Sequence, residues 1–172
     1  KKKNYNVFFK RSKRLASDNI SKLDVIQDAL HRSENYYKKK YDYVIDLDVT
    51  SPLRILKDIN KSISLVINQN ANNLFSVNKA RKNPYFNMVE MKNNTYRPIK
   101  EIKKNIVSRQ KAPKVFDMNA SIYVWKCDFL KKNKTLFSNK TITYEMPFQR
   151  SIDIDDKDDL RYVKYILNNV RL

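Results

Sequence analysis

The sequence predicts a three-layer α/β fold, in which helices cover an open and mostly parallel β-sheet. Apolar segments with the length of strands occur at 43–47 and 74–77, and residues with helical spacing lie before and between them. This alternation of strand and helix is typical of parallel pairing through right-handed crossovers. The length of 172 residues and the hydrophobic fraction of 41% suffice for one buried core.

The amino-terminal part is expected to hold one strand and one helix. Residues 6–9 read as a short buried strand. A helix is predicted from about Lys22 to Tyr37, capped by Ser21 or Asp18, because its apolar residues fall on one face.

The segment 43–47 is the clearest strand, and it ends in the loop 48–54 because Pro52 cannot donate to a β-ladder. A second helix should follow, with apolar residues at helical spacing between Ile55 and Ile67, and then a strand at 74–77. Ligands of open parallel sheets bind at the carboxyl ends of the strands. The loop 48–54 therefore lies where chemistry is expected.

The segment 79–113 lacks clear periodicity, and a loop of this length without a function is uncommon in a compact domain. We expect a hairpin arm or a partner-contacting insertion there. Residues 1–78 and 114–172 then form the α/β core. Its later part should contain strands at 121–125 and 141–146 and a final helix at about 157–169.

The composition narrows the classes of function. The net charge of +18 suggests nucleic acid at first. However, 26 lysines and 10 arginines are mostly scattered singly, whereas nucleic-acid sites favour arginine forks and exposed aromatic residues. We expect a general attraction for anionic ligands such as nucleotide phosphates, and a basic nucleic-acid-binding protein is the alternative from a different class.

The numbers of cysteine, histidine and glycine residues restrict the kinds of site that the chain can form. The single cysteine, Cys127, excludes an internal disulfide, and with only His31 beside it there is no zinc set, so a reducing cytoplasm is expected. Cys127 reads as a packing residue and His31 as a structural or surface residue. No apolar run approaches the roughly eighteen residues of a membrane span. The chain has no glycine, on which phosphate-binding loops depend, so another segment must supply such a loop if one is used.

The acidic segment 151–159 contains the sharpest candidate for chemistry. If 152–154 ends a strand, Asp153 and Asp155 point to the same side, because side chains alternate along a strand. Two such carboxylates suit a hard divalent cation, typically Mg²⁺ on a nucleotide phosphate. The acidic residues at 156–159 instead favour the start of a helix, where they face the positive end of its dipole.

Two further polar groups leave alternatives open. The hydroxyls and the guanidinium in the loop 48–54 suit phosphate or sugar hydroxyls, or they satisfy backbone groups of a turn. The second group suits a polyhydroxylated, carboxylated ligand, or it reflects ordinary capping and surface polarity. Its members are Arg109, Gln110, Asn119 and Tyr123.

Six motifs, taken in sequence order, resemble the acylneuraminate (CMP-nonulosonate) cytidylyltransferase family. They are Arg11 with Leu15-Ala16-Ser17-Asp18, Asp48-Val49-Thr50-Ser51-Pro52-Leu53-Arg54, Asn83-Pro84-Tyr85-Phe86-Asn87, Arg109-Gln110 with Pro113, Asn119-Ala120-Ser121-Ile122-Tyr123, and Ser151-Ile152-Asp153-Ile154-Asp155. The resemblance runs from about Val7 to the last helix. It implies a Rossmann-like nucleotidyltransferase sheet with an inserted dimerisation arm at 79–113.

The resemblance also implies an activity and its participants. Such enzymes transfer CMP from CTP to the anomeric hydroxyl of a nine-carbon 2-keto acid sugar, release pyrophosphate and require Mg²⁺. They are homodimers, and the arm helps to complete the partner's sugar site. No nucleic acid or membrane takes part.

Individual residues receive roles by the same resemblance. Asp153 and Asp155 match the metal-binding carboxylates, and Asp155 is also a candidate to activate the sugar hydroxyl. Arg11 and Lys22 match nucleotide contacts. The implied sugar contacts are Asp48, Thr50, Ser51, Arg54, Arg109, Gln110, Asn119, Tyr123 and Phe137, and among them Arg109 suits the sugar carboxylate.

The sequence departs from the family at three points. Asp48 stands where sialate enzymes usually carry glutamine. A carboxylate only accepts hydrogen bonds, whereas the amide of glutamine also donates them. The chain looks closer to relatives that act on bacterial sugars such as legionaminic acid. Ala120 replaces the usual glycine. The opening strand and triphosphate loop of the family have no counterpart here, so we expect this chain alone to be inactive. A non-catalytic dimeric relative is a further alternative.

Overall fold

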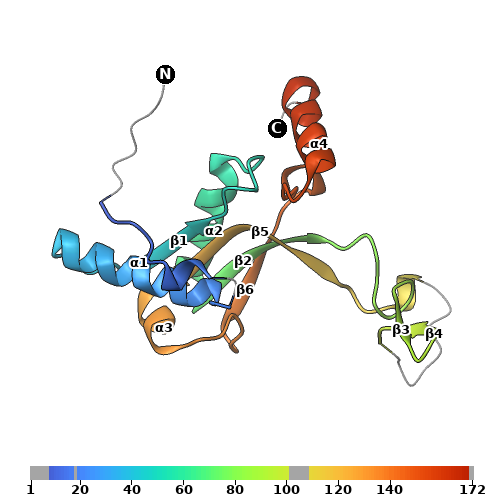
Figure 1. Cartoon of the computed structure of the whole chain (residues 1–172), viewed down its shortest axis with the longest axis horizontal. Coiled ribbons are helices and arrows are strands. Elements are labelled where there is room, and N and C mark those ends of the chain that lie inside the picture. The colour runs from blue at the N-terminus through green and yellow to red at the C-terminus, as the bar shows by residue number, and fades with distance from the viewer. Residues whose placement is uncertain (1–7, 18, 101–108, 171–172) are drawn as a thin grey trace. The chain divides into compact units, whose positions relative to one another are not determined.

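The computed structural model describes residues 8–17, 19–100 and 109–170, and it confirms the α/β class (Figure 1). The helices are α1 (Lys22–Tyr37), α2 (Leu56–Asn68), α3 (Cys127–Lys132) and α4 (Lys157–Asn169). The strands are β1 (Tyr43–Leu47), β2 (Asn73–Lys79), β3 (Val89–Lys92), β4 (Thr95–Pro98), β5 (Phe116–Lys126) and β6 (Thr141–Glu145). Single 3₁₀ turns lie at Arg14–Ala16, Arg109–Lys111 and Phe148–Arg150.

The main sheet has the strand order β1-β5-β2-β6. Strand β1 pairs antiparallel with β5, with Tyr43 opposite Lys126 and Leu47 opposite Ile122. Strand β2 also runs against β5, because Lys126 N–H donates to the carbonyl of Asn72 whereas Ala80 N–H donates to that of Val115.

Strand β6 provides the parallel pairing. On the β2 side, Asn72 N–H donates to Lys140 O, and Val77 O accepts from Met146 N–H. Strands β2 and β6 therefore run in the same direction. The sheet is therefore mixed, and the prediction of a mostly parallel sheet is wrong. The reason is the position of β5, which separates the two strands that α2 connects and pairs antiparallel with each of them.

The chain forms two compact units. The first unit comprises Lys1–Asp48, Ile55–Phe75 and Ile122–Thr143. The second unit comprises Val49–Arg54, Ser76–Ser121 and Tyr144–Leu172, so it contains the predicted arm at 79–113 together with the acidic segment.

Helix α1 has the bounds that the sequence predicts. Its N-cap is Ser21, whose hydroxyl accepts a hydrogen bond of 3.1 Å from Asp24 N–H. Asp18, the other predicted cap, lies outside the described residues. Helix α1 buries Leu23, Ile26 and Leu30 and is joined to α3 through Gln27, whose amide donates to the carbonyl of Asn133 at 3.1 Å.

Helix α2 also follows the prediction, with Ile55 as the residue that precedes it. Asp58 closes its first turn, because the carboxylate accepts a hydrogen bond of 3.0 Å from Ile55 N–H.

Strand β1 is only half-buried, and Ile45 is exposed, because β1 is the outermost strand of the described sheet and has a partner on one side only.

Other residues take the left-handed positions that glycine usually fills. Among the described residues, those with positive φ are Lys38, Asn70, Asn93, Asn94 and Ala120. Asparagine tolerates this conformation better than most residues, and two successive positive φ values suit a tight hairpin turn such as that between β3 and β4. Ala120, with φ of 53°, has no such polar side chain and sits within β5, so its backbone is strained.

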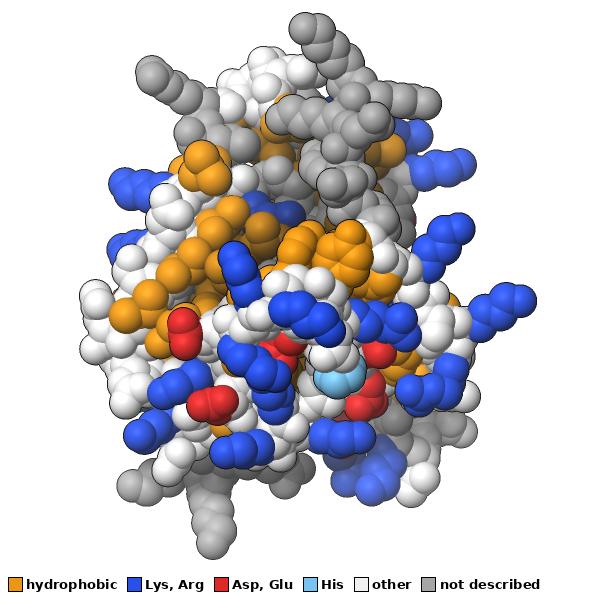
Figure 2. Space-filling model, turned by 90° about the vertical axis from the view of Figure 1, so that its left-hand side faces the viewer, with side chains coloured by type: hydrophobic (Ala, Val, Ile, Leu, Met, Phe, Trp, Pro, Cys, Tyr) orange, Lys and Arg blue, Asp and Glu red, His pale blue; other side chains and the backbone are white. Residues whose placement is uncertain are grey.

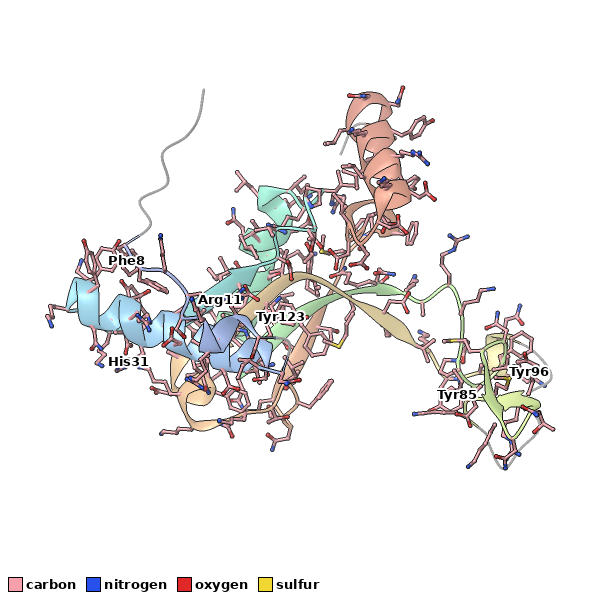
Figure 3. The ribbon with its side chains drawn as sticks, viewed as in Figure 1. Phe8, Arg11, His31, Tyr85, Tyr96 and Tyr123 are labelled. Atoms are coloured by element: carbon pink, nitrogen blue, oxygen red, sulfur yellow. The ribbon has the colours of Figure 1, made fainter. Side chains whose placement is uncertain are left out.

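The segment predicted as an arm contains a β-hairpin. Strand β3 pairs antiparallel with β4, with Val89 opposite Pro98 and Lys92 opposite Thr95. The side chains of this hairpin are exposed, including Val89, Met91 and Tyr96. Figure 3 labels Tyr96 and Tyr85 in this region. A hairpin is thus present in this segment, and its role as a dimerisation arm stays a prediction.

Two local expectations have other outcomes. Residues 6 and 7 of the first predicted strand lie outside the described residues, while Phe8 and Phe9 are not in a strand. Phe8 instead stacks on Tyr36 of α1, with the ring centroids 4.7 Å apart. Residues 152–154 do not form a strand either.

Within the described parts of the chain, no helix has the length and apolarity needed to cross a membrane.

Candidate functional site

The predicted site residues are divided between the two units. Arg11, Lys22, Asp48, Tyr123 and Phe137 belong to the first unit. Thr50, Ser51, Arg54, Gln110, Asn119, Asp153 and Asp155 belong to the second unit. The side chain of Arg109 lies outside the described part of the structure.

The acidic pair lies in the extended segment before α4. Asp153 is half-buried, and its Oδ1 atom is buried without a hydrogen-bond partner among the described residues. Asp155 is exposed, and its N–H donates to Asp159 Oδ2 at 3.1 Å. The two carboxylates are thus available for another ligand, and an uncompensated buried oxygen of this kind favours a cation.

The acidic residues that follow start α4, as the sequence predicts. Asp156 is the N-cap, and its Oδ1 accepts hydrogen bonds from the N–H groups of Asp158 at 2.7 Å and Asp159 at 2.9 Å. Asp159 completes a capping box by accepting from Asp156 N–H.

Apolar packing fixes the segment that carries Asp153. Ile152 and Ile154 pack against a buried cluster of Leu53, Val163 and Ile166. Ile154 N–H also donates to the carbonyl of Thr50 at 2.9 Å. The position of Asp153 is therefore defined on both sides, even though no regular strand forms there.

The loop 49–54 has the contacts of a satisfied turn. The hydroxyl of Ser51 donates to the carbonyl of Asn119 at 3.3 Å. Arg54 donates from Nη1 to the carbonyls of Ser51 at 2.6 Å and Ser121 at 3.4 Å. These contacts agree with the turn interpretation, and contact between this loop and a sugar or a phosphate stays a prediction.

In the first unit, Lys22 bridges two aspartates at the end of β1. Its Nζ atom lies 2.9 Å from Oδ2 of Asp46 and 2.9 Å from Oδ2 of Asp48. It also lies 4.5 Å from the ring centroid of Tyr123. Burial acts to lower the pKa of Lys22, but the hydrogen bonds to Asp46 and Asp48 prevail and raise it above the ordinary value.

A pocket of about 360 Å³ opens beside Lys22. Its aromatic wall consists of Tyr123 and Trp125, stacked at 6.3 Å with an interplanar angle of 5°, and Phe137. Phe137 is 62% exposed and contacts Phe75 edge-on at 5.7 Å. The pocket thus brings together three predicted residues, namely Lys22, Tyr123 and Phe137.

The cations at this pocket are compensated by carboxylates. Lys134, which also lines it, lies 3.2 Å from Asp24, and Lys22 lies between its two aspartates. With aromatic and aliphatic walls, the pocket suits an uncharged group better than a phosphate. Arg11, the other predicted nucleotide contact, is exposed and is labelled in Figure 3.

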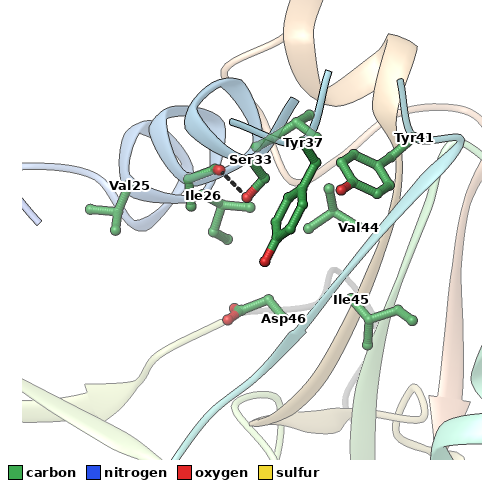
Figure 4. Close-up of a pocket in the computed structure, with 10 residues that line it drawn as sticks. Val25, Ile26, Ser33, Tyr37, Tyr41, Val44, Ile45 and Asp46 are labelled. Atoms are coloured by element: carbon green, nitrogen blue, oxygen red, sulfur yellow. Dashed lines mark hydrogen bonds between the residues drawn. The ribbon is translucent and has the colours of Figure 1, made fainter. Parts of the chain in front are cut away.

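The first unit holds a second pocket. It has a volume of about 350 Å³ and lies between α1 and β1, lined by Val25, Ile26, Tyr37, Val44 and Ile45 among others (Figure 4). Its lining contains none of the predicted site residues.

In the second unit, Gln110 lines a wider hollow of about 600 Å³ together with Lys79, Lys114, Phe116 and Glu145. Lys79 and Glu145 form an ion pair of 3.6 Å there. Gln110 itself is exposed. The hollow therefore places this predicted residue at the base of the hairpin segment, among mixed charges.

The basic residues do not gather into one patch on the face that carries the pale blue His31. Figure 2 shows Lys and Arg side chains spread over this face, with Asp and Glu side chains and apolar areas between them. His31 is exposed, 2.9 Å from Asn35 Nδ2, which confirms a surface position. Cys127 is buried, and burial raises its pKa to about 11, which confirms a packing residue.

Two residues that contribute to the pocket beside Lys22 and to its charges, Asp46 and Trp125, were not predicted from the sequence. Asp46 lies in β1 and Asp48 directly follows its last residue, so the two are two positions apart, as side chains on one side of a strand are, and this spacing is visible in the sequence. Trp125 bears the same relation to Tyr123 on β5. In residues 8–17, 19–100 and 109–170, no group of three or more His, Cys, Asp or Glu side chains forms a ready-made metal cage.

Comparison with known proteins identifies the family. The chain is 40% identical over 166 residues to "Post-translational flagellin modification protein B" of Campylobacter coli, which covers 96% of this chain and 70% of that protein. It is 40% identical over 162 residues to "CMP-N,N'-diacetyllegionaminic acid synthase" of Campylobacter jejuni, covering 94% and 68% respectively.

A more distant relative agrees with these two. The chain is 25% identical over 154 residues to an "N-acylneuraminate cytidylyltransferase" of Streptococcus agalactiae, covering 89% of this chain and 36% of that protein. No protein-family model matches the chain. The resemblance seen in the six motifs is confirmed by relatives that match almost the whole chain, and the chain belongs to the CMP-nonulosonate cytidylyltransferase family.

Proposed function

We propose that this protein transfers CMP from CTP to the anomeric hydroxyl of a nine-carbon 2-keto acid sugar. In this reaction the anomeric oxygen of the sugar forms a bond to the α-phosphorus of CTP, and a base takes the hydroxyl proton. The bond between the α-phosphorus and the oxygen that bridges to the β-phosphate breaks, and pyrophosphate leaves. The names of the relatives at 40% and 25% identity support this activity. The structural observation that supports it is the fixed segment with the buried Oδ1 of Asp153, which has no hydrogen-bond partner among the described residues.

The donor set fits Mg²⁺. This cation prefers oxygen ligands and usually takes only one or two protein carboxylates, with water and substrate phosphates completing its shell. Asp153 offers a buried oxygen that has no hydrogen-bond partner in the described part of the chain, and Asp155 follows two residues later with an exposed carboxylate. We propose that both hold Mg²⁺, which when bound neutralises phosphate charge and lowers the pKa of a coordinated hydroxyl.

The residues of the chain supply positioning and proton transfer. Asp155 is exposed, so it is open to a sugar hydroxyl and is proposed to accept its proton. Asp153 is held by the packing of Ile152 and Ile154, which keeps its carboxylate in one place. Phosphoryl-type transfer asks the protein mainly for such positioning and for charge stabilisation.

The sugar is proposed to be of the legionaminic type. The relative named for N,N'-diacetyllegionaminic acid matches 94% of the chain, which supports this branch. Tyr123 and Phe137 wall a largely apolar pocket beside Lys22, which suits an acylamino substituent. Asp48 accepts hydrogen bonds from the sugar, and Lys22 holds that carboxylate.

The exposed hairpin supports a homodimer. Val89, Met91 and Tyr96 are 60%, 66% and 73% exposed, which is unusual for three large apolar side chains on one small hairpin. We propose that β3 and β4 contact a second copy of the chain. Sedimentation of a protein carrying Val89→Asp and Met91→Asp should then show more monomer than the wild type at the same concentration.

The experiment for the activity is pyrophosphate release by the full-length protein with CTP, Mg²⁺ and a nonulosonate. Asp153→Asn and Asp155→Asn should each lower kcat by at least about a hundredfold. Asp158→Asn is the matched control, because Asp158 is exposed on α4 and pairs only locally, at 2.6 Å with Arg161. Unchanged release by Asp155→Asn would remove its proposed role.

The same protein distinguishes the two alternatives. A basic nucleic-acid-binding protein would bind DNA with a steep salt dependence and show no thermal shift with CTP and Mg²⁺. A non-catalytic dimeric relative would show the thermal shift without releasing pyrophosphate from any sugar. Either result would overturn the proposed reaction.

A further inference from the structure

Asn119 is the centre of a buried hydrogen-bond network in the second unit. The residue is 5% exposed. Its Oδ1 accepts hydrogen bonds from Ser76 Oγ at 2.6 Å and from Ser121 N–H at 3.3 Å. Its Nδ2 donates to Ser151 Oγ at 3.0 Å. One side chain therefore joins β2, β5 and the segment that leads to the acidic pair.

The amide of Asn119 has little capacity left for a substrate. An asparagine side chain offers two acceptor positions and two N–H groups, and three of these four are used inside the protein. The backbone carbonyl of the same residue accepts from Ser51 Oγ at 3.3 Å. This geometry differs from that of a sugar contact, the role that the family resemblance implies for Asn119.

The link from Asn119 to the acidic pair runs through Ser151. The Ser151 hydroxyl receives the hydrogen bond from Asn119 and donates its own proton to Pro147 O at 2.9 Å. Ser151 stands two residues before Asp153, and beyond Asp153 the N–H of Ile154 is bonded to Thr50 O at 2.9 Å. Anchors on both sides therefore fix the backbone that carries the Asp153 carboxylate.

We propose that Asn119 is a positioning residue, which through Ser151 sets the Asp153 carboxylate for a divalent cation. The inference rests on the proposed function, because it assigns Asn119 to the metal rather than to the sugar. It follows from the contacts of the side chain, which lead to the metal-binding segment.

The variants separate positioning from sugar contact. Ser151→Ala removes the acceptor for Asn119, and Ser151→Thr keeps a hydroxyl. Asn119→Asp cannot donate to Ser151, whose own proton is given to Pro147. Asn78→Ser is the matched control, because Asn78 is 4% exposed on β2 but bonds to Lys79 O and Asp117.

The first readout is Mn²⁺ binding to the full-length protein without substrates, followed by the loss of the free-ion electron paramagnetic resonance signal. Ser151→Ala and Asn119→Asp should weaken Mn²⁺ binding by about tenfold or more, as expected for residues that orient a metal ligand. Ser151→Thr and Asn78→Ser should stay within about twofold of the wild type. Unchanged Mn²⁺ affinity in Ser151→Ala would overturn the proposal.

The second readout is the division of the kinetic effect. Ser151→Ala and Asn119→Asp should lower kcat by about tenfold and leave the KM for the sugar within about twofold. A raised sugar KM in Asn119→Asp with normal Mn²⁺ binding would show a direct sugar contact and contradict the proposal. If Asn119→Asp unfolds, Ser151→Ala decides alone. If the wild type releases no pyrophosphate, the proposed reaction fails, whereas the Mn²⁺ titration still decides the positioning role.

Discussion

The ammonium group of Lys22 lies 2.9 Å from a carboxylate oxygen of Asp48. The same ammonium group lies 2.9 Å from Asp46, so one cation at the start of α1 holds two carboxylates at the end of β1. By the resemblance described in the sequence analysis, Asp48 is expected to take the place of a glutamine of sialate enzymes. Its charge is therefore balanced by a partner on another element, and the carboxylate is kept as a hydrogen-bond acceptor beside the aromatic pocket.

Replacing Lys22 should destabilise the protein modestly. Lys22→Met leaves Asp46 and Asp48 close together without a cation, and we expect a loss of about 1 kcal/mol in urea unfolding at neutral pH, because the groups are partly exposed. The control is Lys57→Met on the exposed side of α2, which should change the free energy of unfolding much less. Equal effects of both substitutions would argue against the bridge.

The pH dependence of this contribution has a definite sign. The pKa of Lys22 is raised above its ordinary value of 10.5 in the folded state. The stabilisation is therefore fully present below that value and is lost as the pH rises through the higher pKa of the folded protein. The difference in unfolding free energy between wild type and Lys22→Met should shrink at strongly alkaline pH.

Ala120 should be improved by glycine. The left-handed conformation costs an alanine about 1–2 kcal/mol, and glycine avoids this cost. Part of the resulting stabilisation is lost, because glycine also makes the unfolded chain more flexible. Ala120→Gly should therefore raise the free energy of unfolding by about 0.5–1 kcal/mol, or Tm by about 2 °C.

Ala29→Gly is the control for this substitution, because Ala29 lies in the middle of α1. There glycine should lower the free energy of unfolding by about 1 kcal/mol. The two substitutions should thus shift the urea midpoint in opposite directions. A decrease with Ala120→Gly would contradict the backbone assigned to this part of β5.

Glu34 makes part of the stability acid-sensitive. It is buried in α1, 2.7 Å from Lys131 and 3.2 Å from Lys40. The hydrogen bond from Lys131 lowers the pKa of Glu34 below its ordinary value of 4.5 against the opposing effect of burial. This stabilisation is present above that value and is lost as the pH falls through the lower pKa of the folded state.

Glu34→Gln should therefore lower Tm at neutral pH and flatten its dependence on acid. Between about pH 5 and pH 3, Tm of the wild type should fall more steeply than Tm of Glu34→Gln. The exposed Glu90→Gln on β3 is the control and should keep the wild-type profile. Parallel curves for wild type and Glu34→Gln would show that the pair with Lys131 does not contribute.

The helices and strands with strong local signals were predictable from the sequence. Helix α1 begins at the Ser21 cap and keeps its apolar residues on one face, and α4 begins at the acidic residues 156–159. These signals are local, so the bounds of both helices were predicted correctly. The direction of strand pairing is not local, because the antiparallel position of β5 depends on residues more than seventy positions away from β1. Alternation of strand and helix therefore suggested a more parallel sheet than exists.

The candidate site was predictable as a set of residues but less so in its contacts. The motif around Asp153 was found, yet its position is fixed by packing of Ile152 and Ile154 and not by a strand. Lys22 and Asn119 were matched to ligands by resemblance, whereas the structure gives both internal partners. Such partners come from distant segments of the chain, and no single-sequence pattern indicates them.

The proposed reaction is the transfer of CMP from CTP to a nonulosonic acid. The most direct measurement is pyrophosphate release by the full-length protein with CTP, Mg²⁺ and a panel of nine-carbon 2-keto acids. We predict release that depends on CTP and is fastest with N,N'-diacetyllegionaminic acid, with the CMP-sugar formed in equal amount. Absence of release with every sugar in the panel, under conditions in which the protein is folded, would contradict the account.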